Sequence, residues 1–293
     1  MGRSPAFCHV PTGGAGRKLR SRRILVAAVV LGAVLAAGVA TARAASCPVA
    51  GTGSMTVAEV PDGSTIRLAD GTMVWLAGID VPPRPLTLAA AAPWPLSEAA
   101  RLGLRHLVEG ATVALAPTSD SPDRYGRRHA FVFLPDGRSV ENAMVAAGLA
   151  RARWLPGDDV CFQELLAGES QARDAGIGLW ASPETAVLKA DDPSLLERTG
   201  LYELVEGRLV SVGHGAPMIF LDFGRDYRRD FTVMVSPQVA KGLTAAGVSV
   251  DGLAGRRVRV RGVIEESSGP TIRLNDAAEI EVIDDQDPPG AKP

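Results

Sequence analysis

The 293-residue sequence predicts a mainly β protein with helices (α+β), in which a small closed barrel with packed helices precedes a second β-rich unit. Short apolar or β-branched runs alternate with Asp-Gly turns, and helical patterns come after the first of these runs. The strand pattern returns after residue 200, and the length is sufficient for two domains. A hydrophobic fraction of 46% favours globular structure over disorder.

The first unit is predicted to span residues 50–185. Its strands are expected where apolar runs lie between turn signals, at residues 55–60, 65–68, 73–79, 112–116 and 130–134. Its helices are expected where apolar residues repeat on one face and a glycine such as Gly148 follows, at residues 96–108, 140–147 and 158–175. Short strands with helices packed on them are typical of a small closed barrel.

A charged, proline-interrupted segment, residues 186–199, is predicted to be a linker to a second unit at residues 200–285. Strands are expected there at residues 207–212, 218–223, 230–235, 256–264, 271–274 and 280–283, with one helix at 238–246. The proline-rich tail, residues 286–293, is predicted to be disordered.

The first 44 residues have the composition of an export signal. They hold seven basic residues and no acidic one, with an uncharged apolar stretch at residues 24–42 and a small-x-small site at Ala42-Arg43-Ala44. We therefore predict a cleaved signal peptide and a periplasmic or secreted protein. The run Ser21-Arg22-Arg23 resembles a twin-arginine signal. The alternative is an uncleaved segment that anchors the chain in the inner membrane.

Charge and cysteine content limit the possible partners of the processed chain. Of its 31 Lys and Arg, 24 lie outside the first 44 residues, against 33 Asp and Glu, which disfavours binding of polyanions by charge alone. Cys47 and Cys161 are an even pair in an exported chain and predict a disulfide; two separate thiols, or a lipidated Cys47, are the alternatives. Scattered histidines and the lack of a Cys-x-x-Cys motif disfavour a zinc site.

Several motifs together resemble the thermonuclease (micrococcal-type nuclease) family over about residues 55–181. They are Val60-Pro61-Asp62-Gly63-Ser64-Thr65, Trp75-Leu76-Ala77-Gly78-Ile79-Asp80-Val81-Pro82-Pro83, Asp123-Arg124-Tyr125-Gly126-Arg127 and Gly178-Leu179-Trp180. The resemblance implies a five-stranded OB barrel with packed helices. It also implies Ca²⁺-dependent hydrolysis of phosphodiester bonds in DNA or RNA.

The sequence departs from this family at the positions that carry the chemistry. Active members show Asp where this chain has Ser64, Arg where it has Trp75, and Glu where it has Pro83. The resemblance leaves Arg127 as the retained catalytic position and Asp80 as a weak metal ligand. No cofactor is therefore expected, and Ca²⁺ only if a nuclease site has been rebuilt.

Two alternatives remain open for this first unit. Arg84 or Glu98 could rebuild a hydrolytic site from neighbouring positions. The pentapeptide could instead be purely structural, with Asp123 pairing to Arg127.

The second unit, also OB-like in its pattern, offers a different candidate site. Arg257, Arg259 and Arg261 alternate along one strand and should share a face, and Tyr227 lies within another basic run. Because OB barrels bind oligonucleotides and oligosaccharides, these residues predict weak binding of single-stranded nucleic acid or another polymer. The alternative is a solvated strand face whose arginines pair with acidic neighbours, namely Asp226, Asp230, Glu265 and Glu266.

The sequence therefore predicts an exported thermonuclease-like protein that is catalytically impaired or inactive and acts as a binding or envelope module. The alternative function is a Ca²⁺-dependent nuclease with a rearranged site. Whether the chain is an enzyme stays open at this point.

Overall fold

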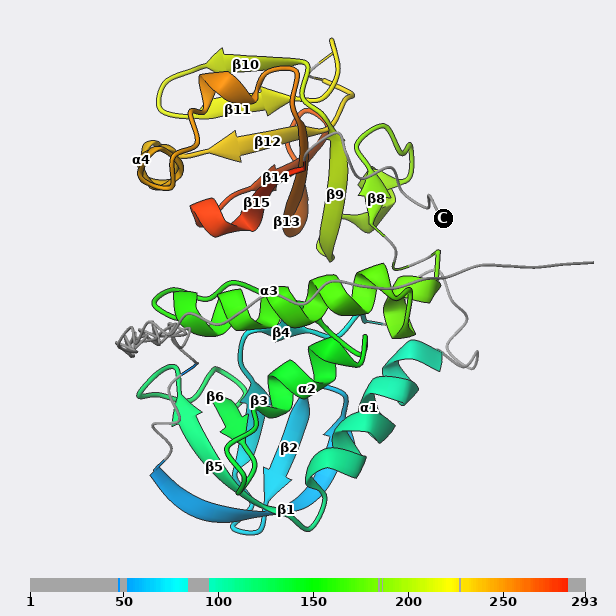
Figure 1. Cartoon of the computed structure of the whole chain (residues 1–293), viewed down its shortest axis with the longest axis vertical. Coiled ribbons are helices and arrows are strands. Elements are labelled where there is room, and N and C mark those ends of the chain that lie inside the picture. Colours follow the sequence, from blue (N-terminus) through cyan, green and yellow to red (C-terminus); the bar gives the residue numbers. More distant parts are fainter. Residues whose placement is uncertain are drawn as a thin grey trace, which may run out of the picture. The chain divides into compact units, whose positions relative to one another are not determined.

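A computed structural model describes residues 47, 52–83, 95–183, 185, 187–226 and 228–283 (Figure 1). The predicted signal peptide or anchor, Arg84, Tyr227 and the proline-rich tail lie outside the described residues. Within the described ranges, no helix has both the length and the apolar character needed to cross a bilayer.

Five strands of the first unit form a closed barrel in the order β1-β2-β3-β6-β5. The strands are β1 (Thr52–Asp62), β2 (Thr65–Leu68), β3 (Met73–Leu76), β5 (Thr112–Pro117) and β6 (Arg128–Phe133). The pairs β1·β2, β2·β3, β5·β6 and β1·β5 are antiparallel, whereas β3 and β6 are parallel. The predicted five-stranded OB barrel is therefore confirmed.

The predicted strand at residues 73–79 is broken in the structure. Gly78 has φ +71°, and a Cβ at this position would lie 2.9 Å from the ring of Phe131. Only glycine fits both conditions, so the chain turns there and continues as β4 (Ile79–Asp80). β4 leaves the barrel and pairs with β7 (Arg151–Ala152).

Three helices pack on this barrel at the predicted places: α1 (Pro95–Val108), α2 (Val140–Ala146) and α3 (Asp159–Asp174). Ser139 caps α2 by accepting a hydrogen bond from the amide of Asn142. Apolar residues of all three helices join the barrel interior in one core, among them Leu104, Met144 and Phe162. A short 3-10 helix, η1 (Gly178–Ala181), follows α3 and contains the Gly-Leu-Trp motif.

The second unit repeats the strand order of the first. Its sheet runs β10-β11-β12-β14-β13-β9-β8, with β15 also paired to β13. The strands are β9 (Tyr202–Arg208), β10 (Ser211–His214), β11 (Ile219–Asp222), β12 (Thr232–Val235), β13 (Arg257–Glu266), β14 (Pro270–Arg273) and β15 (Ile280–Ile283). If β9 and β10 count as halves of one bent strand, the order equals that of the first barrel, including one parallel pair, β12·β14.

Three elements of this unit differ from the ranges expected from the sequence. The strand expected at residues 207–212 straddles the break between β9 and β10, where Leu209 is buried in the core. The segment predicted as a linker contains η2 (Leu195–Arg198) and β8 (Leu188–Lys189), which pairs with β9. Helix α4 (Pro237–Ala245) begins one residue before its predicted start, with proline following the Ser236 cap. The division into domains with the predicted bounds remains a prediction.

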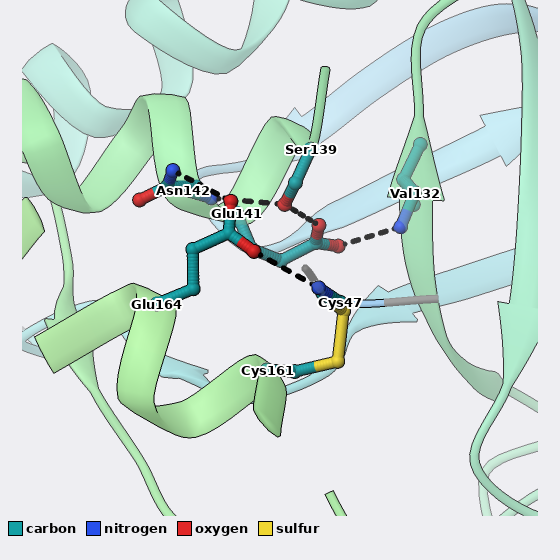
Figure 2. Close-up of a disulfide and its surroundings, with 7 residues drawn as sticks. All are labelled: Cys47, Val132, Ser139, Glu141, Asn142, Cys161 and Glu164. Atoms are coloured by element: carbon teal, nitrogen blue, oxygen red, sulfur yellow. Dashed lines mark hydrogen bonds between the residues drawn. A yellow bond between two sulfur atoms is a disulfide. The ribbon is translucent and has the colours of Figure 1, made fainter. Parts of the chain in front are cut away.

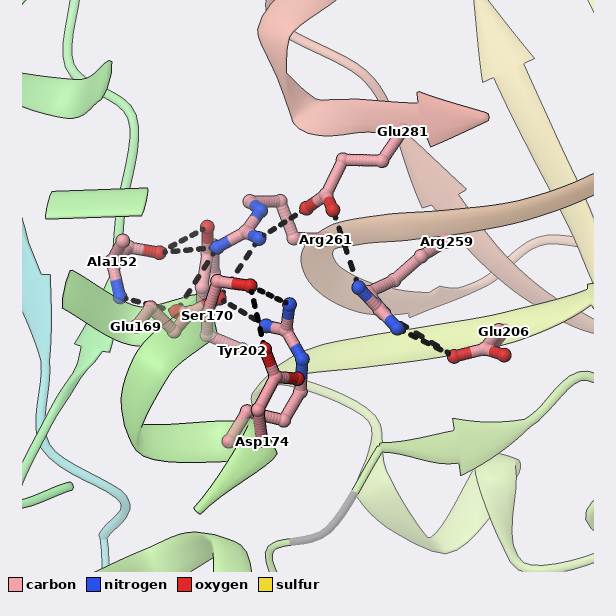
Figure 3. A network of polar contacts seen from close by, with 10 residues as sticks. Ala152, Glu169, Ser170, Asp174, Tyr202, Glu206, Arg259, Arg261 and Glu281 are labelled. Carbon is pink, nitrogen blue, oxygen red and sulfur yellow. Dashed lines mark hydrogen bonds and ion pairs between the residues drawn. The ribbon is translucent and has the colours of Figure 1, made fainter. Parts of the chain in front are cut away.

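A buried charge network joins α3 to the second sheet (Figure 3). Arg261 of β13 donates to both carboxylate oxygens of Glu169, at 2.9 and 3.1 Å, and to Glu281 at 2.7 Å. Tyr202 of β9 donates to the carbonyl of Ala152 at 3.2 Å. Arg261 is 1% exposed and Glu169 is 0% exposed, so this pair is desolvated and depends on its full set of partners.

The predicted disulfide is present between Cys47 and Cys161, with Cα atoms 4.5 Å apart (Figure 2). Cys161 lies in the first turn of α3, and the amide of Cys47 donates to Glu164 of the same helix at 3.1 Å. The bond therefore ties the segment before β1 to α3.

Candidate functional site

The residues that correspond to the nuclease centre come from three neighbouring places in the first barrel. Ser64 lies in the turn between β1 and β2, Trp75 lies on β3, and Arg127 ends the loop between β5 and β6. The register of the parallel pair β3·β6 places Trp75 opposite His129, two residues after Arg127. The barrel thus brings these three predicted positions to one end of β3.

Arg127 is held by its own loop. Its side chain forms an ion pair with Asp123 at 2.8 Å, and its amide donates to the same carboxylate at 2.9 Å. Burial raises the pKa of Asp123, but hydrogen bonds from Arg127 and Tyr125 outweigh this effect and hold the pKa well below its usual range. Asp123 therefore stays ionised, and its pairing with Arg127, one of the predicted alternatives, is confirmed.

Trp75 occupies the space beside this guanidinium. The Cζ atom of Arg127 lies 4.4 Å from the centroid of the Trp75 ring, a cation–π distance. Trp75 also meets His129 edge to face, with ring centroids 4.7 Å apart. An indole offers one neutral N–H donor, so it cannot replace the forked, charged donors of an arginine.

Ser64 forms its hydrogen bonds within the turn between β1 and β2. Its amide and its hydroxyl both donate to Oδ1 of Asp62, at 2.8 and 3.0 Å, which closes the hairpin between β1 and β2. Pro83 is exposed and has no ionisable group. Neither residue offers a carboxylate for metal binding or proton transfer.

Asp80 is turned toward the network between the barrels. Its Oδ1 lies 3.9 Å from Arg153, and its buried Oδ2 has no hydrogen-bond partner within the described residues. Burial raises the pKa of Asp80 to about 6, although Arg151 and Arg153 oppose the shift. Among the described residues, no hydrogen bond or ion pair links this carboxylate to Arg127.

These residues do not fit a Ca²⁺ ion. Calcium takes six to eight oxygen ligands, usually including several carboxylates. Asp80 supplies one carboxylate, and the hydroxyl of Ser64 already donates to Asp62. Within the part of the chain that the structure describes, no three His, Cys, Asp or Glu side chains cluster in a way that could hold a metal ion. Glu98, considered as a replacement, is exposed and pairs with Arg101.

The three arginines of β13 are engaged with acidic residues. Arg257 forms an ion pair with Glu206, Arg259 pairs with Glu206 and Glu281, and Arg261 is buried against Glu169. Arg261 is therefore unavailable to an external ligand. The pairing itself was foreseen as an alternative, but the expected partners, Asp226, Asp230, Glu265 and Glu266, were wrong. Binding of nucleic acid by this face remains a prediction.

Sequence reasoning missed the roles of Glu169 and His129. Glu169 lies in the amphipathic pattern of α3, where Glu is ordinarily exposed, and its partner Arg261 is 92 residues away. His129 follows the pentapeptide by two residues, but its contact with Trp75 depends on the parallel pairing of β3 and β6. Only a prediction of strand register would have found it.

Comparison with protein families agrees with this geometry. Residues 73–182 match the family described as Staphylococcal nuclease homologue, which is less than half of the chain. The match includes Trp75, Asp80, Pro83 and Arg127 and begins after Ser64. Among curated proteins, no match to the chain was found. The predicted resemblance is confirmed for this segment: the chain contains a staphylococcal-nuclease-like domain.

Proposed function

We propose that this protein is an exported thermonuclease-like protein whose nuclease site is catalytically impaired, and that it acts as a binding or envelope module. One observation carries the proposal above all others. The guanidinium of Arg127 pairs with Asp123 and lies against the ring of Trp75. Trp75 stands in the place where a second arginine would complete a phosphate clamp.

The proposed impairment follows from the three demands of phosphodiester hydrolysis. A divalent cation must be held by carboxylates, a base must activate water, and charged donors must stabilise the developing oxyanion. Asp80 lacks a second carboxylate, Pro83 cannot accept a proton, and Trp75 cannot donate a charged pair of hydrogen bonds. Loss of a single electrostatic donor lowers turnover by about 10²–10³-fold, so the combined loss should be larger.

Export is supported by the leader sequence and is consistent with the disulfide. Disulfides persist in oxidising compartments and are rare in the cytosol. We propose that the signal peptide is removed and that the mature chain starts near Ala45. N-terminal sequencing of periplasmic or secreted protein checks this; recovery of the full-length chain from the cytosol would contradict it. A retained inner-membrane anchor is the alternative location.

A second candidate function is a Ca²⁺-dependent nuclease with a rearranged site, which the retained Arg127 and Asp80 favour. The purified protein, incubated with denatured DNA or RNA with and without excess Ca²⁺, separates the two. We expect no hydrolysis in either condition. Robust cleavage that requires Ca²⁺ and disappears in Arg127→Ala would establish the nuclease and end the first proposal.

A further inference from the structure

A groove of about 490 Å³ lies over β10, β11 and β12 of the second barrel. This volume falls within the range of pockets that hold small ligands. We propose that the groove is a binding site for a short, uncharged oligosaccharide. The groove lies in a barrel outside the nuclease-like segment, so the test of this proposal does not depend on whether the first barrel is catalytically active.

The floor of the groove is built from two cross-strand pairs. Phe220 lies opposite Met234 and Asp222 lies opposite Thr232, and all four side chains share one face of the β11·β12 pair. The residues between them on each strand, such as Leu221, point to the opposite face and are buried in the core. The groove therefore lies on the outer face of the barrel wall.

Two glycines keep the groove open at one side. Gly213 of β10 pairs with Phe220, and a Cβ added there would lie 3.7 Å from the Asp222 carboxylate, inside the hollow. At Gly215 an added Cβ would come within 2.7 Å of the Phe220 ring. Any larger residue at Gly215 would displace this ring, so the glycine fixes where the aromatic surface lies.

The loop between β13 and β14 forms the other side. Ser268 lines the groove with φ +58°, and it has the only positive φ of a non-glycine residue among the described residues. Non-glycine residues in this conformation cluster at functional sites. Ser267 and Ser268 are both exposed, so their hydroxyls can reach a ligand.

The chemistry of the lining favours a sugar over a nucleic acid. An aromatic ring beside hydroxyls and a carboxylate suits a ligand with apolar ring faces and many hydroxyl groups. Single-stranded nucleic acids are instead bound in positively charged grooves. Within the described residues no Lys or Arg lines this groove, whereas Asp222 contributes a negative charge.

The position of the groove agrees with this assignment. OB barrels bind oligosaccharides and oligonucleotides on the face of their second and third strands, between the first and fourth inter-strand loops. Here β11 and β12 are the second and third strands, and Gly215 and Ser268 lie in the two flanking loops. The topology thus indicates the β11·β12 face as the binding face, and the side chains on it favour an oligosaccharide over an oligonucleotide.

Isothermal titration calorimetry of the full chain tests the proposal with four uncharged trisaccharides: cellotriose, maltotriose, triacetylchitotriose and mannotriose. A thymidine oligonucleotide serves as the charged comparison. We expect saturable binding of at least one sugar and none of the oligonucleotide. Absence of binding to all four sugars at millimolar concentration, or binding of the oligonucleotide alone, would overturn the proposal.

Two variants locate the binding on the protein. Phe220→Ala should weaken sugar binding by about tenfold or more, because the stacking surface is lost. Ser267→Arg adds a bulky charge at an exposed position, so it should weaken binding without disturbing the fold. Glu265→Gln, on the neighbouring end of β13 and outside the groove, is the matched control and should bind as the parent does. Unchanged affinity in Ser267→Arg would place the sugar elsewhere.

Discussion

In the first barrel, the first inter-strand loop, the third strand and the fourth loop supply Ser64, Trp75 and Arg127. In the second barrel the matching places supply Gly215, Met234 and Ser268. The strand order is the same in both barrels, but the side chains at these places differ. In the first barrel this place is filled by an indole stacked on a guanidinium, whereas in the second barrel it is kept open by glycines.

The barrel sets where a site lies, while the side chains decide what the site can do. Filling one place with Trp75 removes a charged donor and adds bulk. Leaving glycine at the other preserves a hollow beside an aromatic ring.

The largest effect is expected from restoring the first barrel. Ser64→Asp, Trp75→Arg and Pro83→Glu together should raise Ca²⁺-dependent hydrolysis of denatured DNA by at least about 10²–10³-fold. Each single substitution should do little, because groups that act as a unit are not additive. A fluorogenic DNA substrate measures the rate.

The matched control for this gain is the same triple variant with Arg127→Ala, which should lose the activity again. A triple variant that remains at the parent rate would show that more than these three positions separates the barrel from an active nuclease. The orientation of Asp80 toward Arg153 would then be the first feature to alter.

The second prediction concerns the disulfide of the first barrel. Cys47→Ala with Cys161→Ala should lower the free energy of unfolding by about 4–5 kcal/mol, the entropic value for so long a closed loop. The sequence separation is 114 residues. Urea denaturation measures the change, and reductant should destabilise the parent but not the double variant. Two titratable thiols in the unreduced mature protein would refute the bond.

The third prediction concerns the charge network between the two barrels. Glu169→Gln removes one of the two carboxylates that pair with the buried Arg261, and removing one member of a buried ion pair costs up to about 3–5 kcal/mol. Glu169→Leu combined with Arg261→Met should cost less, since the two most deeply buried charges of the network are removed together. Arg257→Met on the same strand is the control: its ion pair is partly exposed, so about 1 kcal/mol or less is expected. Equal losses in Glu169→Gln and Arg257→Met would argue against a special role for the network.

The fourth prediction is a pH dependence located in the first barrel. Glu141 is fully buried, accepts hydrogen bonds from the Val132 amide and the Ser139 hydroxyl (Figure 2), and burial raises its pKa to about 8. Between the usual carboxyl pKa and this value, the folded state keeps a proton that the unfolded chain has lost. Stability should therefore fall by a few kcal/mol as pH rises from about 4.5 to 8.

Glu141→Gln should flatten this part of the profile, because the amide does not titrate. Exposed Glu98→Gln is the control and should leave the slope as it is. Urea denaturation across the pH range supplies the measurement. A Glu141→Gln profile parallel to that of the parent would mean that another group dominates the slope.

Much of the fold could be predicted because its signals are local. Turn glycines, strand alternation and helix caps placed α1, α2, α3 and most strands within one or two residues. Non-local features could not be predicted in this way. The break at Gly78 depends on the approach of Phe131, and β8 depends on an edge offered by β9.

In the candidate site, too, the residues could be predicted from the sequence but their contacts could not. The resemblance to the thermonuclease family identified Ser64, Trp75, Asp80, Pro83 and Arg127, and the even number of cysteines after the leader predicted the disulfide. The stack of Arg127 on Trp75 and the turning of Asp80 toward Arg153 are properties of three-dimensional packing. The groove of the second barrel was missed because its residues are ordinary strand and loop residues that only the sheet register brings together.

The smallest effect is expected from adding Ca²⁺. Asp80 has no second carboxylate beside it, and its raised pKa of about 6 means that it holds its charge less readily than an exposed Asp. Ca²⁺ at millimolar concentration should therefore leave the melting temperature of the parent unchanged, because stabilisation by a ligand requires binding to the folded state. Mg²⁺ at the same ionic strength is the control for general salt effects. The Ser64→Asp variant should respond more than the parent, since it restores one carboxylate ligand. A clear Ca²⁺-specific rise in the parent, lost in Asp80→Asn, would show that the first barrel still binds calcium and would favour the nuclease alternative.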